Sequence, residues 1–155
     1  GNLSQLGYAE SCTITANSSP LGGGVYFDER DSGIGGCITN CIIYGNTDFD
    51  VGNIHMARAS FCCSATNLPG DGNLNANPLF VNASAGIFAL TPGSPCVNAG
   101  TNLPWMAGAT DLDGHPRIHY DVVDMGCYEY IPEPGVWEIL GLAAMCMLRL
   151  GARKT

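Results

Sequence analysis

The sequence predicts an all-β protein whose first part is a stack of parallel β coils, and three observations support this. Only 13% of the residues are charged, against roughly 25% in an ordinary globular domain, and Lys154 is the single lysine. Amphipathic helices with charged outer faces are therefore excluded. Residues 1–130 hold no apolar pattern of period 3.6 over three turns. Finally, a seven-residue pattern occurs three times in the first half of the chain.

The three copies of the pattern begin at residues 11, 40 and 61, and each has Cys at its second and Asn at its seventh position. In stacked parallel coils, equivalent residues lie above one another about 4.8 Å apart. The alternative is a chance alignment in a chain rich in Cys and Asn. We expect an inward cysteine column of Cys12, Cys41 and Cys62, and an asparagine column at a turn, formed by Asn17, Asn46 and Asn67.

Short β-type runs at residues 24–27 and 54–57 supply further strands between these copies, each bounded by Gly or Asn. The chain contains 8 cysteines but no C-x-x-C pair, so its cysteines indicate small buried apolar residues rather than a zinc site. Disulfides between stacked cysteines are within reach, but parallel side chains rarely adopt the required dihedral, and we predict none.

From residue 68 the chain becomes dense in turns and proline, which interrupts a regular β ladder. We therefore expect three parts: coils over residues 1–67, an irregular cap over residues 68–131 that closes the open end of the stack, and a tail over residues 132–155. The first residues contain no initiator Met and no signal-peptide pattern, which favours a C-terminal piece of a longer or processed protein.

Four ordered motifs in the second half carry a family resemblance. They are residues 77–82 (NPLFVN), 90–100 (LTPGSPCVNAG), 110–118 (TDLDGHPRI) and 123–130 (VDMGCYEY). Together they resemble the choice-of-anchor Q domain, and the match covers about residues 37–130. The sequence departs from that family at Asn77, His115 and Cys127. The resemblance implies the last coils of a bacterial, secreted, right-handed parallel β-helix, and it assigns no reaction.

The tail carries a second resemblance. Pro132, Glu133 and Pro134 precede an apolar stretch that is a candidate short helix, and Arg149, Arg153 and Lys154 follow it. This order is similar to a PEP-CTERM sorting signal, which implies a sorting peptidase of the exosortase type as partner. The basic end would stay cytoplasmic during a transient or permanent membrane contact. The apolar stretch is short for a membrane span, so a helix packed on the domain through Ile139 and Leu142 is the alternative.

Charge limits the other partners. The net charge of −8 and the scarcity of basic residues exclude nucleic acid, because phosphate binding needs clustered Arg and Lys. Extracellular polysaccharide stays open as a partner, with Tyr8, Tyr26, Tyr44 or Trp105 as sugar platforms. Together with the sorting tail, this predicts a secreted or cell-surface protein.

No catalytic set can be assembled from the sequence, and no cofactor is expected apart from a weak calcium candidate. Asp111 and Asp113 lie two apart before Gly114, which suits either a Ca²⁺ loop or an Asp-Gly turn. We therefore expect a non-catalytic end section that closes the solenoid and carries a sorting signal. The alternatives are the C-terminal part of a polysaccharide lyase or glycosidase with its active site upstream, and a carbohydrate-binding or adhesive module.

Overall fold

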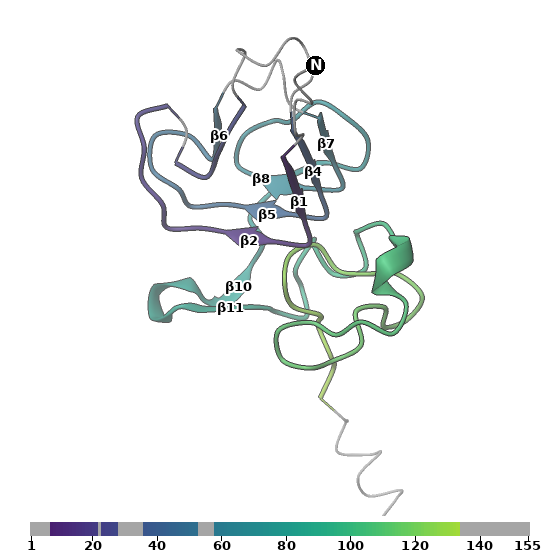
Figure 1. Cartoon of the computed structure of the whole chain (residues 1–155). Helices are drawn as coiled ribbons and strands as arrows, with labels where there is room; N and C mark the ends of the chain where they lie inside the picture. Colours follow the sequence, from purple (N-terminus) through teal and green to yellow (C-terminus); the bar gives the residue numbers. More distant parts are fainter. Residues whose placement is uncertain (1–6, 22, 28–35, 53–57, 134–155) are drawn as a thin grey trace, which may run out of the picture.

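The computed structural model describes residues 7–21, 23–27, 36–52 and 58–133 (Figure 1). Within this part of the chain the protein is all-β, as predicted, and its helical segments are two short 3-10 turns, η2 (Ala83–Ala85) and η3 (Pro104–Met106). The candidate helix of the tail lies outside the described residues.

Three small parallel sheets form the first half. One sheet contains β1 (Tyr8–Glu10), β4 (Cys37–Thr39) and β7 (Arg58–Ser60) in that order. The central sheet contains β2 (Thr13–Ile14), β5 (Ile42–Ile43), β8 (Cys63–Ser64) and β9 (Leu74–Asn75). A third pairs β3 (Val25–Tyr26) with β6 (Val51–Gly52). We call each set of successive strands, β1–β3, β4–β6 and β7–β8, a rung.

The first two sheets share one register. Tyr8 pairs with Cys37 and Thr13 pairs with Ile42, an offset of 29 residues in both cases (37 − 8 and 42 − 13). The next pairs, Cys37 with Arg58 and Ile42 with Cys63, are both offset by 21 (58 − 37 and 63 − 42). These offsets equal those of the repeated pattern. The sequence repeat and the strand pairing therefore have one period.

A sharp corner joins the two sheets on each rung. Ser11, Asn40 and Phe61 sit between the strand of one sheet and the strand of the next, with φ angles of 52°, 55° and 52°. These left-handed conformations are uncommon for residues with a Cβ. Their recurrence at equivalent positions shows that the corner belongs to the repeat.

The central sheet is buried on both faces. Cys41, Ile43 and Cys62 belong to one core cluster inside the coils, whereas Ile42 and Cys63, which alternate with them, belong to a second cluster. The second cluster also contains Leu90, Cys96 and Met125 from the second half of the chain. Two-sided burial is the normal state of a parallel sheet and explains the adjacent apolar residues of β5.

Leu90, Cys96 and Met125 of the second half thus pack on the flank of the central sheet. Figure 1 shows β2, β5 and β8 between the strands labelled β1, β4, β6 and β7 and the hairpin of β10 (Phe80–Asn82) and β11 (Ile87–Leu90). The reason is that the outward side chains of the central sheet are apolar and need a cover.

A short segment covers the last rung. Asn73 occupies the position after Cys62 in the cysteine column, because Cys63 pairs with Leu74. Its Oδ1 accepts the Cys62 N–H at 2.9 Å, and its Nδ2 donates to the carbonyls of Ala59 at 3.0 Å and Pro69 at 2.9 Å. The amide therefore satisfies backbone groups that a further strand would otherwise bind.

Two sequence expectations need revision. The parallel pairing continues through β9 at residues 74–75, so it passes the boundary expected at residue 67. The sheet of β1, β4 and β7 was not expected, because its three-residue strands are too short for a clear alternation of polar and apolar residues. The expected run at residues 54–57 lies outside the described residues, and β6 is the observed partner of β3.

Candidate functional site

The structure brings the three predicted cysteines together. Cys12, Cys41 and Cys62 belong to the same core cluster, and the last two are fully buried. The backbone links them, since Ile42 N–H donates to Cys12 O at 2.8 Å and Cys63 N–H donates to Cys41 O at 2.9 Å. Contact with the Cys41 thiol, then burial, raises the pKa of Cys12. These three cysteines are packing groups of the core, and the seven described cysteines are free.

The asparagine column is only partly formed. Asn17 N and Nδ2 donate to Asn46 Oδ1 at 3.0 and 3.1 Å, so the first two rungs are joined by amides. The next link uses a different residue: Asn46 Nδ2 donates to Asp50 Oδ1 at 3.1 Å, and Asp50 Oδ2 accepts Ala65 N–H at 3.1 Å. Asn67 is exposed. The buried carboxylate of Asp50 therefore forms the link to the third rung that was expected from Asn67.

Asp111 holds a turn together. Its Oδ1 accepts the N–H groups of Asp113 at 2.9 Å and His115 at 2.8 Å, and its Oδ2 accepts that of Glu129 at 2.8 Å. Burial raises the pKa of Asp111, but the backbone hydrogen bonds lower it by more. The pKa of this carboxyl group therefore lies below its ordinary value. In the described part of the chain, no three His, Cys, Asp or Glu side chains are grouped to hold a metal. The geometry favours the Asp-Gly turn over the Ca²⁺ loop.

The sorting motif is described only in part. Pro132 and Glu133 are at the end of the described chain, whereas Pro134, Arg149, Arg153 and Lys154 lie outside it. Of the residues that are described, none forms a helix that could traverse a lipid bilayer.

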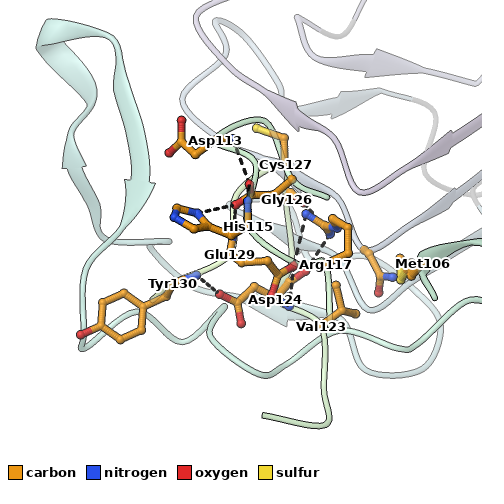
Figure 2. A network of polar contacts seen from close by, with 12 residues as sticks. Met106, Asp113, His115, Arg117, Val123, Asp124, Gly126, Cys127, Glu129 and Tyr130 are labelled. Carbon is orange, nitrogen blue, oxygen red and sulfur yellow. Dashed lines mark hydrogen bonds and ion pairs between the residues drawn. The ribbon is translucent and has the colours of Figure 1, made fainter. Parts of the chain in front are cut away.

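A buried polar cluster lies in the flanking region and contains Arg117, Asp124 and Glu129 (Figure 2), none of which the sequence singled out, together with Asp111. Arg117 is 2% exposed, and its Nη1 lies 3.2 Å from Glu129 Oε1. Its Nη2 donates to the carbonyl oxygens of Gly126 at 3.1 Å and Asp124 at 3.5 Å. One guanidinium thus holds the loop at residues 124–129 by two backbone carbonyls and by the carboxyl group of Glu129.

The acids of this cluster outnumber its single cation. The Asp124 carboxylate accepts the N–H groups of Asn98 and Tyr130, each at 2.6 Å, while Asp124 N–H donates to Glu129 Oε2 at 3.1 Å. Burial raises the pKa of Asp124. Burial, together with the charge of Asp124, raises the pKa of Glu129 to about 8 despite the hydrogen bond from Asp124 N–H and the nearby guanidinium. One guanidinium cannot offset the charge of both buried acids, and the pKa of Glu129 therefore stays raised.

Close contacts attach this cluster to the strands. Gly126 has a φ of +92°, and a Cβ on it would lie 2.8 Å from both Ile42 Cδ1 and Thr13 Oγ1, so only glycine fits. Gly126 N–H donates to Asn40 O at 2.7 Å. The fully buried Asn40 side chain exchanges two 2.8 Å hydrogen bonds with the backbone of Thr101. The flanking region is therefore fixed to the coil corner at residue 40.

The geometry of the cluster indicates that it stabilises the fold. Asp124 and Glu129 are 2% and 6% exposed, and backbone N–H groups occupy their oxygens, unlike a pair of carboxyl groups that faces a sugar substrate. Its members lie in two of the motifs that carry the family resemblance. The signal that could have found it is Arg117 itself, one of three basic residues before residue 149 in a chain with few charges.

Comparison with known proteins identifies no relative: no family model, no curated protein and no solved structure matches this chain.

Proposed function

We propose that this chain is the non-catalytic end section of a secreted or surface-anchored right-handed parallel β-helix, which it finishes and carries to the cell envelope. The observation that carries the proposal is the common register of two sheets, with equal offsets of 29 and 21 residues and a left-handed corner on every rung. A chain that coils around one axis produces this combination, because the two strands on either side of a corner of constant length advance together. Strands beyond a loop of variable length need not keep that offset, and Val25 pairs with Val51 at an offset of 26 (51 − 25).

Burial along the stack supports an end section rather than a complete solenoid. In β2 both residues are half-buried, whereas in β5, one rung further, both are buried. From β3 to β6 the change is larger, from one half-buried and one exposed residue to two buried ones. The first rung thus presents an accessible sheet edge that a further coil would cover. On the last rung, by contrast, the Asn73 side chain binds the backbone N–H of Cys62 and the carbonyl of Ala59.

The tail completes the proposal. The order of Pro132-Glu133-Pro134, an apolar stretch and a basic end supports recognition by a membrane sorting peptidase of the exosortase type. In this role the buried Arg117 cluster keeps the flank folded after export, where the chain functions as scaffold. No residue is assigned to catalysis.

The closing role of Asn73 is tested by Asn73→Ala. We expect a loss of roughly 1–3 kcal/mol in the free energy of unfolding, because three backbone groups lose their partner. Hydrogen exchange at the Cys62 amide should accelerate as well. Asn67→Ala is the matched control, since Asn67 is exposed, and it should change neither measurement. Equal stability and exchange in the two variants would contradict the closing role.

The sorting role is tested by mass spectrometry of the protein recovered from its native host. We expect mature material that lacks Arg153 and Lys154. Glu133→Gln, inside the motif, should leave the tail attached, whereas Glu138→Gln, outside it, should be processed normally. Exported protein that retains both basic residues would show that the tail is not a sorting signal.

A further inference from the structure

A groove of about 500 Å³ runs between the β10–β11 hairpin and the turns that follow β2 and β5. Three aromatic rings line it, those of Tyr44, Phe80 and Phe88. Phe80 and Phe88 pack edge to face with ring centroids 5.4 Å apart, which fixes their orientation across the hairpin. The groove therefore has a preformed apolar wall on one side.

The groove also contains polar groups that no protein atom satisfies. Among the described residues, the hydroxyls of Thr15 and Tyr44 and the Nδ2 of Asn77 have no hydrogen-bond partner, although Asn77 Oδ1 accepts the Leu79 N–H at 3.0 Å. Together these groups offer two hydroxyls that donate or accept and one amide donor. Such a mixed lining differs from a face that only needs an apolar cover.

The backbone of one wall is held in an uncommon conformation. Leu79 has a φ of 53° and is 42% exposed, an unusual combination for a large apolar residue. Asn77 fixes its N–H, and Thr91 fixes its carbonyl with hydrogen bonds from N at 3.1 Å and Oγ1 at 2.9 Å. Conformations of this kind persist where the surrounding contacts enforce them, and they concentrate at binding sites.

We propose that this groove binds a neutral oligosaccharide. The weakly positive C–H groups of a pyranose ring fit the electron-rich faces of aromatic rings, and its hydroxyls fit the free groups of Thr15, Tyr44 and Asn77. No residue that lines the groove is charged, and the chain carries a net charge of −8. An acidic polysaccharide would find no cation in the groove and would be repelled by the whole protein.

The other candidate platforms are less suited. Trp105 is 48% exposed, but its Nε1 donates to Glu10 Oε2 at 2.8 Å, so its polar atom is already used. Tyr8 and Tyr26 lie on the first rung, whose edge a further coil would cover under the proposed function. Tyr44 is the candidate platform that lines the groove. The proposed sugar site therefore depends on the geometry of the groove and not on whether further coils precede the first rung.

The test is isothermal titration calorimetry of the full chain with cellohexaose and mannohexaose, and with oligogalacturonate as the charged comparison. We expect binding of at least one neutral hexasaccharide and none of oligogalacturonate. Phe88→Ala should weaken binding at least tenfold. Tyr44→Phe removes only a hydroxyl and should weaken it roughly three- to tenfold, the equivalent of one hydrogen bond. Trp105→Ala should leave it unchanged.

Three results would overturn the proposal. They are no binding of either neutral hexasaccharide at millimolar concentration, binding that Trp105→Ala abolishes while Phe88→Ala does not, and self-association of the wild type that Phe88→Ala dissolves in sedimentation velocity. The last result would assign the groove to a second copy of the chain. Tyr44→Phe keeps the test decisive if Phe88→Ala disturbs folding, because this change leaves the ring in place.

Discussion

Replacing Arg117 by methionine is expected to lower the free energy of unfolding near pH 7 by roughly 1–3 kcal/mol, the range for leaving buried acceptors without their donor. Methionine fills much of the volume, so the loss comes from the polar groups. The Gly126 carbonyl loses its 3.1 Å donor, and the acids Asp124 and Glu129 lose their cation. Urea unfolding followed by circular dichroism measures the change.

Arg58→Met is the matched control, because Arg58 is exposed on β7 and the substitution is chemically identical. Its cost should stay within about 0.5 kcal/mol. A double-mutant cycle with Glu129→Gln separates the two contributions of Arg117. The coupling between Arg117 and Glu129 should be clearly nonzero, since the two side chains are in direct contact. If Arg117→Met is no more costly than Arg58→Met, the cluster does not hold the flanking region.

The cysteine column could be predicted because it depends only on sequence spacing. Each cysteine, Cys12, Cys41 and Cys62, lies two residues after a strand of one sheet ends and directly before a strand of the next begins. The same pattern therefore fixes all three. The asparagine column failed at its third member because turn chemistry is local. Asp50, which lies on a different loop, accepts the Ala65 N–H in place of Asn67. A repeat predicts strand register better than it predicts which side chain satisfies a turn.

The position of the second half could have been inferred from β5. Ile42 and Ile43 are adjacent, so their side chains point to opposite faces, and both are apolar. A strand that is apolar on both faces needs a cover outside the coil as well as a core inside it. Proline and turn density predicted irregular structure from residue 68, and after the β10–β11 hairpin the described chain contains no strand up to residue 133. They could not indicate which surface that structure covers, because this depends on contacts such as that between Asn40 and Thr101, 61 residues apart.

The Arg117 cluster was harder to predict for a related reason. Its members come from residues 111–129, where the described chain has no regular strand or helix, so no periodicity brings them together. Each acid alone looks like a surface turn residue. What makes them a cluster is the burial of one arginine, and burial in an irregular region follows from tertiary packing rather than from local pattern.

Glu129 should make the protein less stable as pH rises from about 5 to 9. Its pKa is raised to about 8 in the folded state, from an ordinary value of 4.5. Between these two values the folded protein retains a proton that the unfolded chain has released, so the free energy of unfolding falls as pH increases. Each unit of difference corresponds to at most about 1.4 kcal/mol, which makes the total decline a few kcal/mol.

Glu129→Gln removes the titrating proton and should flatten this decline, so that the variant exceeds the wild type in stability above about pH 8. Glu133→Gln, at an exposed position outside the cluster, should follow the wild-type profile.

Both variants should still lose stability on acidification below about pH 4, because the lowered pKa of Asp111 contributes stability that disappears only when its carboxylate is protonated. Thermal unfolding across this pH range measures all three profiles. A decline that persists unchanged in Glu129→Gln would mean that Glu129 is ionised in the folded protein and that Arg117 neutralises it, which would move the retained proton to Asp124.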